Sequence, residues 1–529
     1  MPDKTYDLAI RGGALYDGTG NPPYRGDVLI GGDMLTVSTS PGHDLNVRQT
    51  IDASDLAVAP GFIDMHAHSA LMILANPRHE PKVRQGITTE LIGVDGNSYA
   101  PFRSQTDFRD FVRLNSGLDG DPAVDVNWSS VDDYLACYDQ RVGVNIAYIV
   151  GNSPLRISSV GWGDGAATSA HLADMRQLLA EALEQGSFGL STGLDYPPGE
   201  YANTDELVAL AEVAASHGGV YHTHVRNRLG DRFLDPLREA IDIGRRSGVP
   251  VHITHLYRRV WHTRPATAII QLLEDARSEQ IDVTFDSYPY KYGSSRLVMM
   301  LPPWTHVGGP NEIIKVLESA DGRRRVRADM KPRGSSWQEI WLTNFRNDDN
   351  QQFEGLSVSE ISKLRDEKDE IETVCNLLLE EEMRISFVNE ASEGFTRSKF
   401  LTHPLGMIGS DGLLIGDYPS PRTYGTFPEL VGEFSRDEGF LSLPDAIRRM
   451  TSFAAQRLGL QDRGLLRTGM KADVVVFDPG TIGSPATRTS PKLFPTGIEY
   501  VIVNGVPVVS SGEHTGALPG RALKSGDSI

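Results

Sequence analysis

Two histidines one residue apart, His66 and His68, are the side chains of this sequence best spaced to do chemistry together. They follow the apolar residues 60–63, a run typical of a buried strand. Alternate side chains of a strand lie on one face, so we expect both imidazoles to point to the same place from its C-terminal end. Neutral imidazole is the commonest metal ligand in proteins, and this spacing therefore favours a metal site over two unrelated histidines.

The elements that must position these histidines form a regular pattern. Eight short runs of β type alternate with longer helical segments, as in a parallel sheet built from strand–helix units. The runs lie near residues 62–68, 88–95, 144–150, 188–193, 219–226, 249–255, 281–288 and 406–411. Two helices are well marked: one runs from Ser169 to Gly186, and the other is capped by Thr204 and stops at Gly218. Eight such units predict an α/β fold, a (β/α)8 TIM barrel, over residues 59–467.

Two regions fall outside this predicted barrel. Residues 1–58 and 468–529 both contain alternating apolar runs separated by glycines, so we expect the two ends of the chain to form one small β-sandwich domain. Residues 305–400 are too many for a strand–helix connection, are rich in charge and show a helical pattern at 358–382. We interpret them as a subdomain inserted before the eighth strand, and as a lid over the site.

Ligand-type side chains stand at the C-terminal ends of five of the eight predicted strands. TIM-barrel enzymes build their active sites at these ends. Independent structural histidines would not be expected to line up there, and we therefore predict that these side chains form a metal centre: His66, His68, Asp95, His224, His255 and Asp411.

The remaining histidines of this region fit structural roles better. His222 is two residues before His224 and so lies on the same face of the strand, one layer deeper; we expect it to be buried below the site. His252 is three residues from His255 and faces the other way, as a packing residue would. We expect His79, His217 and His262 to be surface residues.

Composition narrows the class of protein and its partners. The chain has 529 residues, more than usually fold around a single hydrophobic core. Its two cysteines exclude a disulfide framework. Its net charge of −19 disfavours binding to nucleic acid or to an anionic membrane. We find neither a membrane-spanning stretch nor a signal peptide. We expect a cytoplasmic protein that acts on a small-molecule substrate, and the sequence leaves a homo-oligomer open.

Short motifs along nearly the whole chain fit one known family. They are IRGG at 10–13, DGTG at 17–20, GFIDMHAH at 61–68, QGITT at 85–89, STGLDY at 191–196, THVR at 223–226, YPY at 288–290, IGSDG at 408–412, PRTYGTFP at 421–428 and KAD at 471–473. With these motifs the chain resembles the D-aminoacylase (N-acyl-D-amino-acid deacylase) family of the amidohydrolase superfamily. The resemblance implies hydrolysis of an amide C–N bond at a zinc centre. It also implies that Asp411 is the general base and acid, and that the metal ligands are His66, His68, His224 and His255.

Asp95 departs from this family pattern. The family carries a cysteine in a Gly-Asn-Cys-Gly run, where this chain has GVDG at 93–96. A carboxylate is a harder ligand than a thiolate and can bridge two ions, so we expect one or two Zn²⁺ ions, with Mn²⁺ or Fe²⁺ accepted more readily. The fourth strand offers Ser191 and Thr192 but no lysine that could form a carbamylated bridge. The alternative is that Asp95 only forms a turn with Gly96.

A second departure concerns the substrate. The family follows its sixth-strand histidine with His-Lys, and that lysine is associated with the substrate carboxylate; this chain has Leu256 and Tyr257 there. Tyr196, Tyr288 and Arg422 match the substrate pocket that the resemblance implies, and we predict that Arg226 and Tyr257 also contact the substrate. Because the lysine is missing, the substrate stays open between an N-acyl-D-amino acid, a cyclic amide or imide, and another N-acyl compound. Lactone hydrolysis or deamination at the same centre, and a non-catalytic scaffold, are the alternative functions.

Overall fold

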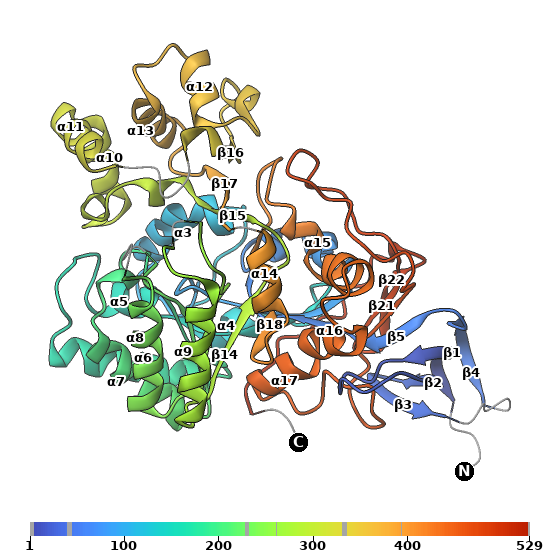
Figure 1. The fold of residues 1–529 in the computed structure, drawn as a ribbon. Coiled ribbons are helices and arrows are strands. Elements are labelled where there is room, and N and C mark those ends of the chain that lie inside the picture. The colour runs from blue at the N-terminus through green and yellow to red at the C-terminus, as the bar shows by residue number, and fades with distance from the viewer. Residues whose placement is uncertain are drawn as a thin grey trace.

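The computed structural model describes residues 5–39, 45–227, 232–260, 262–330, 336–392 and 394–526. Parallel strands occupy its centre (Figure 1). One sheet contains β6 (Phe62–Asp64), β8 (Ile87–Ile92) and β9 (Asn145–Tyr148). A second contains, in spatial order, β10 (Val150–Gly151), β11 (Gly189–Gly193), β12 (Val220–His224), β13 (Val251–Ile253), β14 (Val283–Ser287) and β18 (Gly406–Ile408). A short parallel pair, β7 (Ala67–His68) and β19 (Gly412–Leu413), joins the ends of the first and last strands.

These strands follow one another in chain order and all their pairings are parallel. Each of the eight runs expected from the sequence contains one of them. Their C-terminal ends consequently lie along a common edge, where the side chains that follow each strand can meet.

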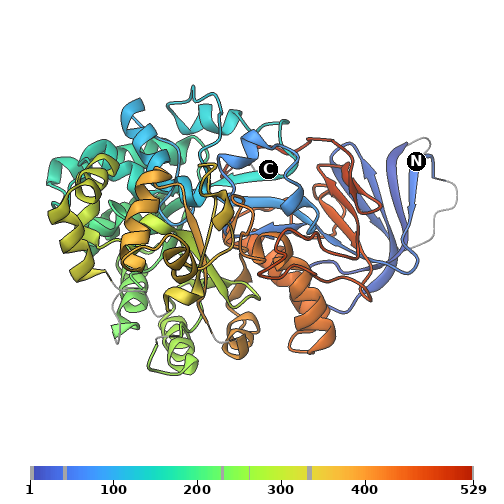
Figure 2. The ribbon, with the colours of Figure 1, turned by 90° about the horizontal axis from the view of Figure 1, so that it is seen from above.

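Helices connect the strands and cover the sheets from outside (Figures 1 and 2). They include α5 (Asn152–Ser159), α6 (Ser169–Glu184), α7 (Thr204–Ser216), α8 (Asp235–Ser247), α9 (Ala266–Ser278), α14 (Gly394–Leu401), α16 (Leu443–Met450) and α17 (Ser452–Leu458). The cap predicted for α7 was wrong by one residue. The side chain of Asn203, not of Thr204, accepts a hydrogen bond from the Glu206 N–H, because the capping residue precedes the first helical one.

Strands from both ends of the chain form one further sheet, at the side of the molecule (Figure 2). It contains β1 (Tyr6–Leu15), β2 (Tyr24–Gly31), β3 (Met34–Ser38), β4 (Val47–Asp52), β5 (Ala57–Pro60), β20 (Val474–Phe477), β21 (Ile498–Val503), β22 (Val506–Ser510) and β23 (Glu513–His514). The ends meet where β5 pairs antiparallel with β20. Since β5 ends two residues before β6 begins, this sheet anchors the start of the strand that leads to the two histidines.

A separate group of elements lies between β14 and β18, in the upper part of Figure 1. It contains β15 (Tyr292–Arg296), α10 (Pro310–Glu318), α11 (Ala320–Asp329), β16 (Ile340–Thr343), α12 (Val358–Leu364), α13 (Glu370–Glu380) and β17 (Ser386–Glu390). β15, β17 and β16 form an antiparallel sheet. The helical pattern at 358–382 is two helices, because Ser357 and Asp369 each cap a new one. The group packs on α3 (Gln105–Asp119), where Ser386 donates a hydrogen bond to the Gly117 carbonyl.

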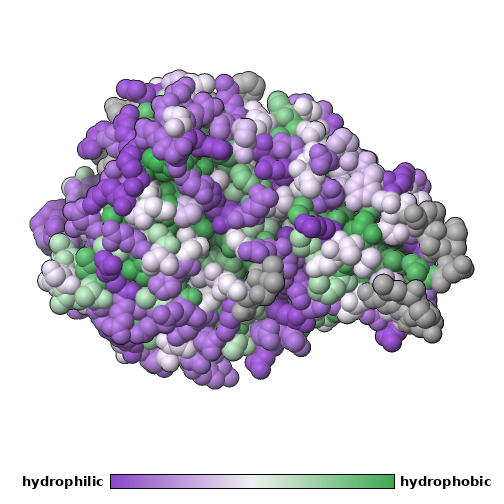
Figure 3. Space-filling model, turned by 90° about the horizontal axis from the view of Figure 1, so that it is seen from below, coloured by the Kyte–Doolittle hydropathy of each residue, from purple (hydrophilic) through white to green (hydrophobic). Residues whose placement is uncertain are grey.

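The surface agrees with the charged composition. Within the described residues, no helix combines the length and apolar character needed to cross a membrane. The face seen in Figure 3 is mainly hydrophilic, with hydrophobic residues in small groups.

Candidate metal centre

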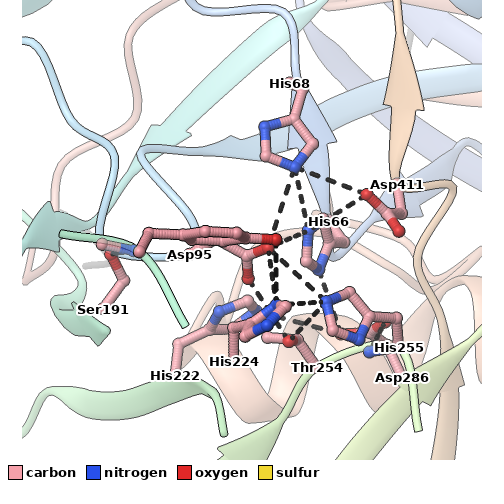
Figure 4. A network of polar contacts seen from close by, with 12 residues as sticks. His66, His68, Asp95, Ser191, His222, His224, Thr254, His255, Asp286 and Asp411 are labelled. Atoms are coloured by element: carbon pink, nitrogen blue, oxygen red, sulfur yellow. Dashed lines mark hydrogen bonds and ion pairs between the residues drawn. The ribbon is translucent and has the colours of Figure 1, made fainter. Parts of the chain in front are cut away.

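Three buried side chains from two paired strand ends form the first half of the site (Figure 4). His66 lies between β6 and β7, His68 ends β7, and their Nε2 atoms are 3.3 Å apart. Asp411 lies between β18 and β19, with Oδ1 3.4 Å from His68 Nε2 and 3.7 Å from His66 Nε2. Pairing of β19 with β7 brings these residues together across a long stretch of sequence.

Asp95, His224 and His255 form the second half. Asp95 Oδ2 is 3.3 Å from His224 Nδ1 and 3.5 Å from His255 Nε2, and these two nitrogens are 2.9 Å apart. The same carboxylate oxygen is 3.6 Å from His66 Nε2 and 3.9 Å from His68 Nε2. One oxygen of Asp95 therefore stands within 4 Å of all four imidazoles, between the two halves of the site.

Three of these six residues have unusual backbone conformations. Asp95, His255 and Asp411 have φ of 54°, 34° and 48°, in the left-handed region that costs of order 1–3 kcal/mol for a residue other than glycine. Beside Asp95, Gly93 has φ of 84°, and a Cβ there would lie 2.1 Å from the Ile149 carbonyl oxygen. Such strain gathers at functional sites, where the surrounding structure holds a side chain in a required direction.

The spacing of the donor atoms fits a divalent metal ion. A tetrahedral zinc ion with bonds of about 2.0–2.1 Å requires donors about 3.3 Å apart. Within the first half the donor–donor distances run from 3.3 to 3.7 Å, and within the second from 2.9 to 3.5 Å. Imidazole nitrogens with carboxylate oxygens suit Zn²⁺ and also Mn²⁺ or Fe²⁺.

The outer nitrogens of three of these histidines face buried carboxylates that sequence reasoning missed. His68 Nδ1 lies 2.9 Å from Asp119 Oδ1, His224 Nε2 lies 3.0 Å from Asp195 Oδ2, and His66 Nδ1 lies 3.6 Å from Asp286 Oδ2. Such partners orient a metal-binding imidazole and select its tautomer. Asp286 could have been found, because it is the next-to-last residue of β14 and so lies at the same edge as the others.

Carboxylates dominate the electrostatics of the site. Burial lowers the pKa of His68, but the nearby Asp119 and Asp411 outweigh it and raise that pKa to about 8. Burial likewise raises the pKa of Asp95, yet His66, His224 and His255 hold it well below its usual range. The buried negative charge therefore draws positive charge into the centre, either as protons on the imidazoles or as metal ions.

The other histidines correct part of the sequence analysis. His222 and His252 are buried beneath the site, with rings 4.9 Å apart, as expected. His217 is exposed, also as expected. His79 is buried with its Nε2 2.9 Å from Glu90, and His262 is buried with its ring stacked on Phe233. Their prediction as surface residues was wrong, because their partners come from segments that no local pattern connects to them.

A cavity of about 770 Å³ opens onto the site. His68, Asp95, His224, His255 and Asp411 line one part of it, together with four of the predicted substrate residues: Tyr196, Tyr257, Tyr288 and Arg422. The wall contributed by residues 297–390 is mainly apolar, and its large side chains are Met299, Met300, Leu301, Trp304, Met330 and Phe387. Asn227 and Arg259 also line the cavity, and sequence reasoning had not included them.

Arg226, the fifth predicted substrate residue, is not among the described residues that line the cavity. Its guanidinium donates to Glu239 Oε2 at 3.0 Å, to the Glu200 carbonyl at 2.6 Å and to the Ala202 carbonyl. These partners turn it away from the site. The structure therefore does not bring Arg226 to the cavity with the other four, and its hydrogen bonds tie the segments after β11 and β12 together.

Comparison with known proteins gives a consistent result. The amidohydrolase family model matches residues 49–284 and 368–509, and leaves out most of the segment between β14 and α13. D-aminoacylase of Alcaligenes xylosoxydans xylosoxydans is 33% identical over 98% of both chains. N-acyl-D-aspartate deacylase of the same organism is 32% identical over 99% of this chain and 96% of its own.

Two solved structures are also similar over nearly the whole length. N-acyl-D-glutamate deacylase from Bordetella bronchiseptica, complexed with zinc and a phosphonate mimic of the tetrahedral intermediate, superposes with a TM-score of 0.84 at 29% identity, covering 99% of this chain and 100% of that one. A D-aminoacylase structure concerned with its binuclear metal centre superposes with a TM-score of 0.82 at 30% identity, covering 98% and 100%.

Proposed function

Since this chain belongs to the amidohydrolase family and is a metal-dependent hydrolase of amide C–N bonds in small N-acyl compounds, we propose that its substrates are N-acyl-D-amino acids carrying a large apolar group. The observation that carries this proposal is the cavity. It is lined by the proposed metal ligands, by the guanidinium groups of Arg259 and Arg422, and by an extended apolar wall. Similarity to D-aminoacylase and to the deacylases of N-acyl-D-aspartate and N-acyl-D-glutamate supports the D configuration.

We assign two metal-binding groups. His66, His68 and Asp411 form one group, and His224 and His255 form the other. Asp95 belongs to the second group and would also bridge to the first, which is supported by its Oδ2 lying 3.3 Å from His224 Nδ1 and 3.6 Å from His66 Nε2. Together they would hold one or two zinc ions. Zinc held by these residues would lower the pKa of water to about 7 and polarise the carbonyl of the scissile amide.

Asp411 is the general base and acid in this proposal. Burial raises its pKa, but Arg422, whose Nη2 is 2.9 Å from Oδ2, and His66 hold that pKa well below its usual range. The carboxylate is therefore ionised at neutral pH, and its Oδ1 atom can accept a proton from the attacking water. It then hands this proton to the amide nitrogen, which leaves as an amine while the acyl group becomes a carboxylate.

The polar end of the cavity suits the carboxylate of an acylated amino acid. Arg422 lies over the Tyr288 ring at 4.4 Å and donates to Ser294 Oγ at 2.9 Å. Arg259 donates to the Tyr257 hydroxyl at 2.9 Å. A planar guanidinium pairs well with a carboxylate. Arg422 Nη2 is already held by Asp411 Oδ2 and Ser294 Oγ, so Arg259 is the guanidinium we assign to the substrate carboxylate, with Arg422 beside it. The positive charge of these arginines would replace that of the lysine which the family carries at the position of Tyr257.

The apolar wall decides between neutral and acidic side chains. N-acetylalanine has about nine non-hydrogen atoms, whereas 770 Å³ holds about 25 waters at their liquid volume of roughly 30 Å³. A small acetylated amino acid would leave most of the apolar wall wet. Three methionines of that wall, Met299, Met300 and Met330, adapt their shape to different apolar groups. An aspartate or glutamate side chain placed there would lose most of its hydration among apolar side chains and would lie near the Asp329 carboxylate.

Four finer expectations from the sequence remain proposals. The parallel strands in chain order support a (β/α)8 barrel at residues 59–467, and the sheet shared by both ends supports a small β domain of residues 1–58 and 468–529. The cavity wall drawn from residues 305–400 supports a role for that insertion as a lid. A cytoplasmic location is supported by the sequence having only two cysteines.

A substrate panel tests the proposal. Release of free amine is measured with N-acetyl-D-methionine, N-acetyl-D-tryptophan, N-acetyl-D-aspartate, N-acetyl-D-glutamate, the L enantiomers and a cyclic imide. We expect kcat/KM for the apolar D compounds to exceed that for the acidic ones by at least about tenfold, about 1.4 kcal/mol. Trp304→Ala should lower kcat/KM for the apolar compounds about tenfold. Trp341→Ala, which like Trp304 lies between β14 and β18 but is outside the cavity wall, is the matched control.

A preference for the acidic D compounds, the L enantiomers or the cyclic imide would overturn the assigned substrate. An equal loss in the Trp304 and Trp341 variants would show that the apolar wall is not a substrate contact.

A further inference from the structure

A second buried cluster of charge lies beside the metal centre and takes no part in the chemistry described above. Its charged members are Asp64, Lys82 and Glu90, all fully buried. They come from β6, from α2 (Glu80–Val83) and from β8. Ser410, also fully buried, joins them from the residue before Asp411.

Lys82 is the centre of this cluster. Its Nζ donates to Ser410 Oγ at 2.6 Å and to Asp64 Oδ2 at 2.8 Å, and lies 3.3 Å from Glu90 Oε1. The Ser410 hydroxyl in turn donates to Asp64 Oδ2 at 2.5 Å. The ammonium therefore makes two hydrogen bonds, to Ser410 and Asp64, and an ion pair with Glu90.

The two carboxylates connect Lys82 to the backbone that carries the catalytic side chains. Asp64 Oδ1 accepts the N–H of His66 at 3.1 Å and that of Ser410 at 2.8 Å. The Asp411 N–H donates to the His66 carbonyl at 2.9 Å. Glu90 Oε2 accepts the hydroxyl of Ser69, the residue after His68, at 2.5 Å. Asp64 and Glu90 thus hold the backbone of His66, the residue after His68 and the residue before Asp411.

Stability alone does not account for this arrangement. Withdrawing three charged groups from water costs several kcal/mol each, and well-packed apolar side chains of similar volume are often at least as stable. A fully bonded ionic cluster does fix geometry, and a metal or catalytic constellation has to be held within about 0.5 Å. Metal sites depend in this way on partners outside the ligand shell.

We propose that Lys82 is a positioning residue for the metal centre: through Asp64, Glu90 and Ser410 it fixes the backbone that directs His66, His68 and Asp411 toward one another. This inference rests on the metal-binding roles proposed above for those three residues. Lys82 itself touches neither the ligand atoms nor the cavity.

Cobalt substitution tests the proposal, because the visible absorption bands of Co²⁺ respond to the geometry of its ligands. Lys82→Met removes the ammonium, and Ser410→Ala removes one hydroxyl link while leaving every charge in place. We expect both to weaken cobalt binding by about 10- to 100-fold and to change the absorption bands. We also expect kcat to fall more than KM rises, since the substrate contacts remain.

Two control variants carry the same kinds of change elsewhere. Arg156→Met breaks the buried ion pair of Arg156 with Glu206, and Ser187→Ala removes a buried hydroxyl that donates to the Tyr148 carbonyl at 3.2 Å. Both should lower thermal stability without altering cobalt affinity or absorption.

The outcomes separate this inference from the function on which it rests. If Ser410→Ala and a folded Lys82→Met variant both keep the wild-type cobalt spectrum, affinity and kcat, the positioning role is refuted. If Lys82→Met does not fold, Ser410→Ala alone decides. If the controls change the spectrum as much as the test variants do, the effect is general loosening and the proposal also fails. Failure of the wild-type protein to bind cobalt would overturn the proposed metal centre, and the positioning role with it.

Discussion

Replacing Asp95 with alanine should damage the metal centre more than any other single truncation outside the histidines. Oδ2 of this buried carboxylate is within 3.9 Å of the ring nitrogens of His66, His68, His224 and His255. Removing it leaves His224 and His255 as a pair of ligands without the third, and removes the atom shared between the two halves of the site.

The size of the effect follows from this position. Loss of a partner that merely orients a ligand costs about 10- to 100-fold in metal affinity. Asp95 lies among the donor atoms themselves, so we expect at least about 100-fold weaker binding at the His224 and His255 group, about 2.7 kcal/mol. Alanine at the positive φ of 54° adds a cost of about 1–2 kcal/mol to folding.

Two further variants separate ligand chemistry from backbone strain. Asp95→Asn keeps the shape and tolerates positive φ, but lacks the negative charge, so it should lose metal with little loss of folding stability. Asp95→Cys should retain zinc, because a thiolate binds it well, and should bind Mn²⁺ less well than the wild-type protein does. Zinc and manganese per chain are measured by mass spectrometry, affinity by chelator competition, and kcat with N-acetyl-D-methionine.

If Asp95→Ala keeps the metal content, affinity and kcat of the wild-type protein, the reasoning is refuted. Asp95 would then only form the turn that includes Gly93 and Gly96, and the site would depend on the histidines and Asp411.

Three other predictions address the mechanism and the stability. Asp411→Asn should keep metal at the Asp95, His224 and His255 group but lose about 10²- to 10⁴-fold in kcat, because it cannot take the proton, and a loss below about threefold would remove Asp411 from the mechanism. Removing metal with a chelator should lower the free energy of unfolding, by about 4 kcal/mol if the ion was present at 1,000 times its Kd, and an unchanged melting temperature would contradict a bound ion. Burial raises the pKa of Glu90, but His79 and Lys82 outweigh it and lower that pKa from 4.5 to about 2. The ionised carboxylate therefore stabilises the fold above pH 4.5, and this stability is lost as the pH falls toward 2. Between pH 6 and pH 3 the loss should be about 2 kcal/mol, and smaller in Glu90→Gln, as measured by urea unfolding at the two pH values; an identical pH dependence in the two proteins would contradict it.

Local pattern alone identified the strands and the side chains at their ends. A strand alternates its faces every residue, so the spacing of His66 and His68 already implied that they share a face. Parallel strands share an edge, so residues placed after different strands, such as Asp95, His224 and Asp411, could be expected to meet without knowledge of any contact. These inferences depend on periodicity and strand direction, which neighbouring residues determine.

The tertiary structure alone decided which groups pair with one another. Asp119 is 51 residues from His68, and nothing in the sequence between them indicates that the end of α3 supplies the carboxylate for that imidazole. The same holds for Lys82, whose burial depends on Asp64, Glu90 and Ser410 closing around it. Arg226 lies two residues from His224, yet Glu239 turns it away from the cavity. Side-chain pairing depends on the direction and packing of distant segments, and this information arises only when the chain has folded.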